Sequence, residues 1–204
     1  MIFYRFAHLA VGGLYRLLYR LRIVGREHVP EGGVIVCVNH SSLADPVLVA
    51  LALKPRDHPR FMAKAELFRI FGFNWLIKKL GAFPVERGTS DITAIKGSLQ
   101  FLKEGSKVLI FPHGRRVESD EEAAAMKAGA AMLAFRSGAP ILPVYLSPGR
   151  KCFVNRIEVI FGEPFFAEKT DGSRVEQYAA VSERLRREIY ALKAQTVSKQ
   201  LSDD

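Results

Sequence analysis

A histidine and an aspartate, separated by four residues, occupy the polar break in a long apolar stretch. The stretch runs from Val34 to Leu53, and His40 and Asp45 lie within the break. When a carboxylate holds one nitrogen of a neutral imidazole, the ring has a fixed tautomer and its other nitrogen is available as a base. The pair is therefore a candidate for general base catalysis on a hydroxyl group.

Each residue of the pair also has an ordinary structural explanation. Asp45 precedes Pro46, and this order is typical of the start of a helix. The two roles are compatible, because one carboxylate oxygen can accept from a backbone amide while the other accepts from the imidazole. Ser41 and Ser42 are too close in sequence to His40 to be assigned as nucleophiles beside its free nitrogen. The chain also has no G-x-S-x-G motif. The activated hydroxyl is therefore expected to belong to a substrate, which favours acyl transfer to an alcohol.

Basic residues follow two later apolar runs. Arg87 comes just after a predicted strand over residues 82–85. The loop after a second predicted strand, over residues 107–111, contains His113, Gly114, Arg115 and Arg116. If these strands are parallel neighbours, both loops lie on the same side of the sheet as His40. The guanidinium group binds phosphate well through its planar set of donors, so a phosphate-bearing substrate is favoured.

The positions of the apolar residues predict alternating strands and helices. Strands are expected over residues 34–38, 61–63, 82–85, 107–111, 141–146 and 157–161. Helices are expected over residues 46–53, parts of 67–80, 90–103, 126–136 and 175–192. In the 90–103 helix, Ser90 is the expected cap, and the expected apolar face consists of Ile92, Ile95, Leu99 and Leu102. The alternation predicts an α/β fold, a single domain with a largely parallel sheet flanked by helices.

The first 22 residues have a different character. They are apolar and aromatic, but they contain four arginines and the Gly12-Gly13 pair, which argues against a simple transmembrane helix. The arginines continue to the end of the segment, unlike those of a signal peptide. One or two helices lying in a membrane interface fit this pattern, and packing on the protein's own core is the alternative. We therefore expect a membrane-interface segment over residues 1–22 and an acyltransferase domain over residues 23–204.

The charge balance favours an anionic partner. The chain has 30 Lys and Arg residues against 21 Asp and Glu residues, a net charge of +9. It has no zinc-finger spacing, no RNA-binding signature and no basic region followed by heptads, so anionic lipid is preferred over nucleic acid. The two cysteines, Cys37 and Cys152, are expected to be reduced thiols, and no metal site is predicted.

Four short motifs occur in a fixed order between about residues 25 and 164. The first consists of Asn39, His40 and Asp45, and the second of Gly81, Phe83 and Arg87. The third is FPHGRRV, residues 111–117, and the fourth is PILPVYL, residues 140–146. This series resembles the glycerolipid acyltransferases of the lysophosphatidic acid acyltransferase (1-acylglycerol-3-phosphate O-acyltransferase) type. The third motif departs from the family's usual Phe-Pro-Glu-Gly-Thr-Arg-Ser.

The resemblance implies a reaction and a set of roles. The enzyme would move a fatty acyl group from acyl-CoA or acyl carrier protein to the free hydroxyl of 1-acylglycerol-3-phosphate, without a metal or bound cofactor. His40 would act as the base and Asp45 would orient it. The residues expected to bind the acceptor are Arg87, Arg116, Gly114, His113, Arg115 and Lys64. The resemblance also implies an N-terminal pair of anchoring helices, on the cytoplasmic face of the cell membrane.

Two other functions remain open from the sequence. A thioesterase or lipase would use His40 with a serine, and would hydrolyse its substrate without an acceptor. An acyltransferase-like protein of the membrane surface would have an altered acceptor or no turnover, because His113 replaces the family's glutamate. A histidine can donate to an anion, but it cannot replace a carboxylate that accepts from hydroxyls.

Overall fold

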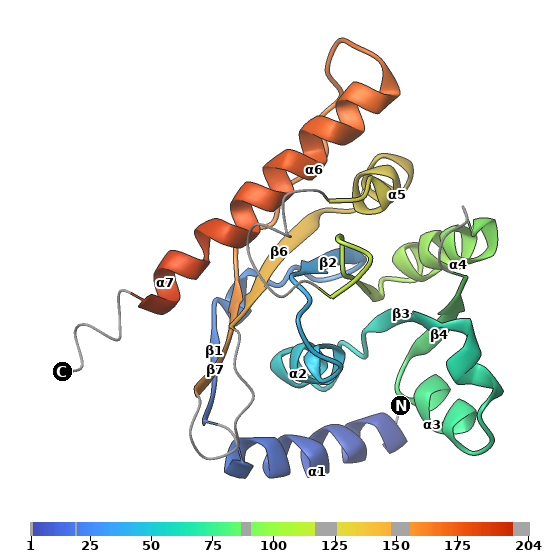
Figure 1. Cartoon of the computed structure of the whole chain (residues 1–204), viewed down its shortest axis with the longest axis vertical. Coiled ribbons are helices and arrows are strands. Elements are labelled where there is room, and N and C mark those ends of the chain that lie inside the picture. The colour runs from blue at the N-terminus through green and yellow to red at the C-terminus, as the bar shows by residue number, and fades with distance from the viewer. Residues whose placement is uncertain (1, 19, 87–90, 117–125, 148–155, 198–204) are drawn as a thin grey trace.

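One sheet organises the chain in the computed structural model, which describes residues 2–18, 20–86, 91–116, 126–147 and 156–197 (Figure 1). Seven strands form it in the described part of the chain, in the order β1-β7-β6-β2-β5-β3-β4. They are β1 (Arg20–Val24), β2 (Val34–Val38), β3 (Arg60–Lys64), β4 (Ala82–Val85), β5 (Lys107–Ile110), β6 (Ile141–Leu146) and β7 (Arg156–Phe161).

The five strands from β6 to β4 are parallel, which confirms the expected fold class. Strand β2 pairs in parallel with β5 and β6, and β3 pairs in parallel with β4 and β5. Only the β6–β7 pairing is antiparallel, and β1 runs parallel to β7. The carboxyl ends of β2, β3, β4, β5 and β6 therefore meet at one edge of the sheet, where open α/β folds bind their ligands.

Helices cover both faces of the sheet. The chain forms α1 (Ile2–Leu18), α2 (Asp45–Ala52), α3 (Phe73–Lys79), α4 (Ile92–Lys103), α5 (Gly129–Ser137), α6 (Arg174–Ala191) and α7 (Lys193–Val197). Two short 3₁₀ helices are η1 (Arg26–His28) and η2 (Ala65–Arg69). Helices α4, α5 and α6 lie on one side of the sheet, and α1 and α2 lie on the other (Figure 1).

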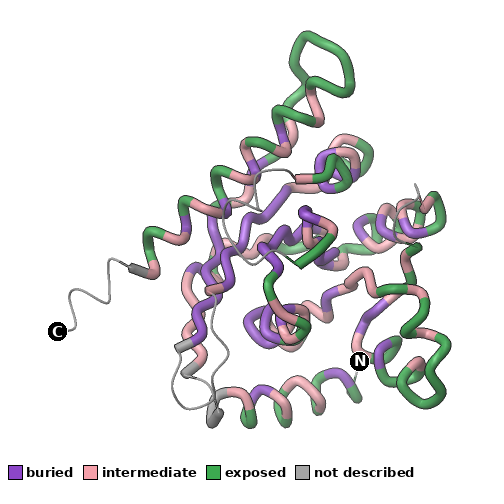
Figure 2. The backbone as a smooth tube through the Cα atoms, in the orientation of Figure 1, coloured by how far each residue is buried: buried purple, intermediate pink, exposed green. Residues whose placement is uncertain are grey.

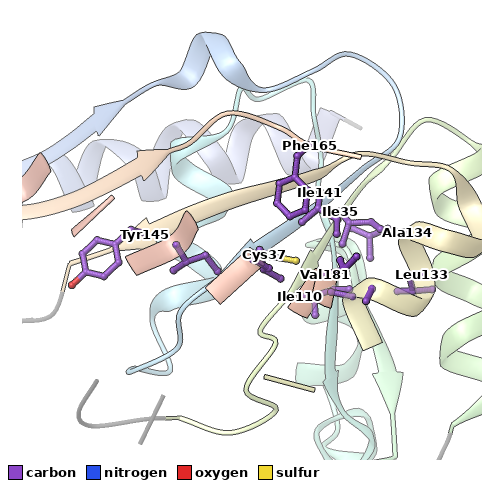
Figure 3. Close-up of a cluster of buried hydrophobic side chains, with 14 of the residues drawn as sticks. Ile35, Cys37, Ile110, Leu133, Ala134, Ile141, Tyr145, Phe165 and Val181 are labelled. Carbon is purple, nitrogen blue, oxygen red and sulfur yellow. The ribbon is translucent and has the colours of Figure 1, made fainter. Parts of the chain in front are cut away.

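The core has two layers, one on each face of the sheet, and β2 is buried on both faces. Ile35 and Cys37 belong to the layer under α5 and α6, part of which is drawn in Figure 3. Val34, Val36 and Val38 belong to the layer under α2. This alternation is typical of a central parallel strand. Cys37 is a free, fully buried thiol whose pKa is raised by burial, whereas Cys152 lies outside the described residues.

Helix α1 is a single helix, so the expected pair of N-terminal helices is not found in the described residues. Its inner side packs on the protein, with Tyr4 buried, the His8 ring donating to the carbonyl of Leu53 at 3.3 Å, and Gly12 beside Leu51. The outer side is exposed (Figure 2). Packing on the protein's own core is therefore confirmed for the inner side, and binding of the outer side to a membrane stays a prediction. Among the described helices, none combines the length and apolar content needed to span a membrane.

Strand β1 changes the expected boundary of the N-terminal segment. Residues 20–22 lie in β1, and Leu21 and Arg22 are in register with Ile157 and Glu158 of β7. The Arg22 guanidinium donates to the Glu158 carboxylate at 2.8 Å. A membrane segment separate from the folded domain would have to end before β1, because the sheet needs this strand's backbone hydrogen bonds.

Helix α4 corrects two details. Its cap is Asp91, whose side chain accepts from the Ala94 amide at 2.9 Å, whereas Ser90 lies outside the described residues. Ile92 is exposed instead of facing the sheet, and the fully buried stripe consists of Ala94, Ser98 and Leu102. Small residues at the first two positions let the helix approach the sheet closely, and the Ser98 hydroxyl is satisfied by the Ala94 carbonyl at 2.8 Å.

Candidate active site

The loop that follows β2 brings His40 and Asp45 together. The Nδ1 atom of His40 donates to Oδ2 of Asp45 at 2.9 Å. His40 is buried except for a small part of its surface, and Asp45 is 0% exposed. Because Asp45 occupies Nδ1, the nitrogen that remains for a substrate is Nε2. The spacing in the sequence therefore predicted this contact correctly.

One carboxylate oxygen of Asp45 accepts three hydrogen bonds within the loop. Besides the imidazole, Oδ2 accepts the backbone amides of Ser41 at 2.7 Å and Ser42 at 2.8 Å. We expected one oxygen to accept from the backbone and the other from the imidazole. This is wrong for these three donors, which all share Oδ2. Asp45 is also the first residue of α2, with Ala44 in the cap position, so its charge lies at the positive end of the helix dipole.

Asn39 fixes the same loop to the neighbouring strand. Its side-chain amide donates to the Leu146 carbonyl at 2.9 Å, and its side-chain oxygen accepts from the Leu146 amide at 2.7 Å. The side chain therefore continues the ladder between β2 and β6 beyond the last paired residues. Asn39 is a positioning residue, and the residues it joins are 107 positions apart in the sequence.

The face of the His40 ring is covered by Phe111. The two rings are stacked, with centroids 4.1 Å apart and planes inclined by 27°. Phe111 comes directly after β5, the parallel neighbour of β2, so sheet topology alone brings the rings together. The contact restricts the imidazole to one orientation and excludes water from one of its faces.

A cavity of about 430 Å³ opens beside this ring. Its walls are mainly apolar, and they come from β3, β4, β5, α4, α5, α6 and the loops at the carboxyl edge of the sheet. The described lining residues include His40, Met62, Val85, Ile95, Phe111, Met132, Leu133 and Tyr178. The acidic side chains of Glu86 and Asp91 also line it. An apolar cavity with a base at one side suits a substrate that has an alkyl chain and a reactive hydroxyl.

Lys127 also lines this cavity, and the sequence interpretation did not identify it. A Cβ atom built on Gly114 would meet the side chain of Lys127, with Cε at 2.8 Å and Nζ at 2.9 Å. The Lys127 amide donates to the Pro112 carbonyl at 2.8 Å, which fixes the lysine against the third motif. Gly114 has a φ of +71°, a backbone conformation that favours glycine, and the end of the Lys127 side chain lies close above it.

The other predicted basic residues take different positions. Arg115 and Arg116 are exposed at the end of the third motif and are not part of the described cavity lining. Lys64, at the end of β3, is half exposed and forms an ion pair with Glu66 at 3.0 Å. Arg87 lies outside the described residues, although Glu86 immediately before it lines the cavity.

His113 points away from the cavity that its neighbours line. Pro112 and Gly114 are lining residues, whereas His113 is 5% exposed and its ring meets Tyr190 of α6 edge-on, with centroids 6.4 Å apart. Tyr145 of β6 also meets the Tyr190 ring edge-on, at the same centroid separation of 6.4 Å. The structure therefore places the histidine in an aromatic cluster between the sheet and α6, and not at the expected acceptor contact.

Restoring the family's glutamate at this position should lower stability. We expect His113→Glu to reduce the free energy of unfolding by about 3 kcal/mol, because a charged carboxylate would be buried beside the ring of Tyr190. His113→Gln, which is neutral, isolates the effect of charge in urea denaturation at pH 7. The difference in free energy of unfolding between the two variants should become smaller toward pH 5. Burial raises the pKa of a carboxyl group, so the introduced glutamate becomes neutral as the pH falls. Equal stability together with a changed choice of acceptor would place His113 in the site.

Gly81, the first residue of the second motif, has a structural explanation. Its φ is +100°, and a Cβ atom there would lie 2.3 Å from the carbonyl oxygen of Pro59. The Phe61 amide donates to the Gly81 carbonyl at 3.2 Å, so this turn sets the register between β3 and β4. Register in turn fixes where Val85 and Glu86 meet the cavity.

Replacing Gly81 should therefore destabilise the edge of the sheet that forms the site. We expect Gly81→Ala to lower the free energy of unfolding by at least about 2 kcal/mol, from the backbone conformation and from the clash with Pro59. Gly13→Ala in α1 is the matched control, because a Cβ there meets nothing within 4 Å. Chemical denaturation measures both variants, and equal midpoints would contradict this explanation of the motif.

Comparison with known proteins identifies the family of this site. A family model described as Acyltransferase matches residues 20–147, the part of the chain that contains all the cavity residues before β7. The chain belongs to the acyltransferase family. Over 195 residues it is 31% identical to the 1-acyl-sn-glycerol-3-phosphate acyltransferase of Bacillus subtilis, covering 93% of this chain and 96% of that protein.

Two further relatives agree with this membership. The 1-acyl-sn-glycerol-3-phosphate acyltransferase of Streptococcus pneumoniae is 36% identical over 169 residues, which cover 79% of this chain and 61% of that protein. The crystal structure of PlsC, the 1-acyl-sn-glycerophosphate (LPA) acyltransferase of Thermotoga maritima, superimposes with a TM-score of 0.63 at 27% identity. That match covers 85% of this acyltransferase and 72% of PlsC.

Proposed function

We propose that this chain is a 1-acyl-sn-glycerol-3-phosphate acyltransferase that converts lysophosphatidic acid into phosphatidic acid. The observation that carries the proposal is the buried His40–Asp45 pair, at 2.9 Å, beside an apolar cavity at the carboxyl edge of the sheet. The relatives named for this activity, one of them matched over 96% of its length, support the choice of acceptor.

The reaction follows from the geometry of the base. Nε2 of His40 takes the proton from the free hydroxyl of the acceptor as its oxygen attacks the carbonyl carbon of a thioester. The C–O bond forms, the C–S bond breaks, and the proton leaves with the thiol. Asp45 holds the ring in place and stabilises the imidazolium while the proton is on it. The acyl donor is the thioester of either acyl-CoA or acyl carrier protein, and the chemistry at His40 is the same for both.

The phosphate of the acceptor is held at the basic side of the cavity. Lys127 lies over Gly114 inside the lining, and Arg115 and Arg116 follow at the exposed end of the same motif. Arg87 and Lys64 are proposed to complete this group from the neighbouring strand ends. In the family's usual third motif, the arginine is the expected source of positive charge for the phosphate. Here Lys127 supplies part of that charge.

Neutralising Lys127 should weaken binding of the phosphate. We expect Lys127→Met to raise the KM for lysophosphatidic acid roughly tenfold, which corresponds to the loss of one charge-assisted contact. The KM for the thioester and the rate with a neutral monoacylglycerol acceptor should change little. Lys127→Arg should recover most of the affinity. Steady-state kinetics with both acceptors measures the effect, and an unchanged KM would remove Lys127 from the phosphate site.

One experiment separates this function from its alternatives. Purified protein is incubated with labelled acyl-CoA, or acyl carrier protein, and a panel of lysolipids, and the products are resolved by mass. Phosphatidic acid as the main product supports the proposal. Free fatty acid released without any acceptor would indicate a thioesterase, and binding of lysolipid without any product would indicate a protein that has lost turnover.

Membrane association completes the proposal. The acceptor is a lipid, and the exposed outer side of α1 is apolar, which supports peripheral binding at the surface of an anionic membrane. We place the enzyme at the cytoplasmic face of the cell membrane, where both acyl-CoA and acyl carrier protein would reach the cavity. No resident metal or cofactor takes part in the proposed reaction.

A further inference from the structure

The outer side of α1 is apolar for most of the described helix. Tyr4, His8 and Gly12 face the protein, and the exposed apolar side chains lie at other positions of the helix, as expected for an amphipathic helix. These exposed residues are Ile2, Phe3, Phe6, Leu9 and Leu14. The helix has no Asp or Glu, so this side has no negative charge of its own.

A second apolar element lies far from α1 in sequence. Residues 67–76, which include the end of η2, the turn after it and the start of α3, expose a series of large side chains instead of burying them. The exposed residues in this run are Leu67, Ile70, Phe71, Phe73, Trp75 and Leu76. Phe71 is fully exposed beside Gly72, which has a φ of +75°. We define residues 67–76 as the aromatic turn.

The aromatic turn and α1 form one surface. The rings of Phe3 and Trp75 meet edge-on, with centroids 5.3 Å apart. Both elements lie along the lower edge of the molecule in Figure 1, where the start of α1 comes beside α3, and both are largely exposed in Figure 2. A continuous exposed apolar surface of this kind marks an interaction site, unlike apolar residues that are scattered singly.

The charges around this surface indicate its partner. Four basic residues around this surface are exposed: Arg5 on α1, Arg69 at the end of η2, and Lys78 and Lys79 at the end of α3. Residues 67–80 contain no Asp or Glu, like α1. A lipid bilayer with anionic headgroups offers what such a surface lacks, an apolar phase beneath a layer of negative charge. Aromatic rings at the edge of that apolar phase are typical of interfacial anchors.

We propose that α1 and the aromatic turn together form the membrane-binding face, with Phe71 and Trp75 entering the interface of an anionic bilayer. The proposal extends the peripheral membrane binding suggested above from one helix to two elements, and it rests on that association but not on acyl transfer. The aromatic turn leads through α3 into β4, whose last residue, Val85, lines the cavity. The face and the site are thus joined by the eight residues 77–84.

Trp75 allows a direct test, because it is the only tryptophan in the sequence. It is 56% exposed, so its emission in buffer reports a partly hydrated ring. On addition of vesicles of phosphatidylglycerol and phosphatidylcholine, we expect the emission to shift to the blue and to be quenched by lipids brominated near the headgroup end of their chains. Unchanged emission on vesicles that bind the full-length protein would overturn the proposal.

A matched pair of variants isolates the aromatic turn. We expect Phe71→Ser to weaken partition into these vesicles about tenfold or more, the effect of withholding one phenylalanine side chain from an apolar phase. Phe166→Ser removes another exposed phenylalanine, 61% exposed and outside both elements, and should leave partition unchanged. Equal partition of the Phe71 and Phe166 variants would sink the idea.

Two further measurements separate this proposal from others. The His40→Ala protein should bind vesicles as tightly as wild type, so loss of acyl transfer and loss of membrane binding are distinguishable. The chain should stay monomeric in buffer during sedimentation. A dimer that dissociates on Phe71→Ser would show that the surface is covered by a second copy of this chain, and would overturn the proposal.

Discussion

Replacing His40 with alanine is expected to lower the rate of acyl transfer by about 10²–10⁴-fold, the usual contribution of a positioned general base. The loss should fall mainly on kcat, because the apolar walls of the cavity and the basic residues at its side remain. Among the described lining residues, no other histidine is available to replace it.

The control for His40→Ala is His28→Ala. His28 lies in η1, where its ring contacts the Phe161 carbonyl and Glu163 away from the cavity. The His28→Ala protein should therefore retain wild-type turnover. Circular dichroism and urea denaturation establish that both variants are folded. A folded His40→Ala protein with near wild-type turnover would rule out the proposed mechanism.

Asp45→Asn should produce the second largest loss, roughly ten- to a hundredfold in kcat. The amide oxygen can still accept from the Ser41 and Ser42 amides, so the loop keeps its shape. The negative charge that stabilises the imidazolium is gone, and the fixed tautomer is no longer favoured. The effect should be smaller than that of His40→Ala, because a base remains.

The matched control for this variant is Asp57→Asn. Asp57 also accepts a backbone amide in a turn, that of Lys54 at 2.9 Å, but it lies outside the described cavity lining. Initial rates of product formation should be unchanged in this control. If both carboxylate variants lose activity equally, the loss reflects loop stability and not the charge beside His40.

The contact between His40 and Asp45 and the central strands of the sheet could be predicted from the sequence, because both depend on local signals. The β-branched run at residues 34–38 predicts a buried strand, and its end places His40 and Asp45 at the edge where parallel strands present ligands. Two side chains that are five positions apart in one short loop are held close together by the chain itself. The contact therefore followed from short-range geometry.

The rest of the site depends on directions that the sequence does not encode locally. Pro112 and Gly114 face the cavity while His113 between them faces α6, and this depends on a positive φ at Gly114 and on where α6 packs. Lys127 reaches the cavity from a segment without a recognised motif role, so no spacing indicated it. Asn39 bonds to a residue 107 positions away, which only the sheet order reveals.

The three hydrogen bonds accepted by one oxygen of Asp45 have an entropic consequence. In many enzymes, the loop that carries the base becomes ordered only when the substrate binds. The conformational entropy lost by the loop then weakens substrate binding. Here the Ser41 and Ser42 amides and the imidazole are fixed by the same buried atom, so the base becomes oriented when the chain folds. The free energy of acceptor binding is therefore available for bringing the hydroxyl to Nε2, instead of for immobilising the loop.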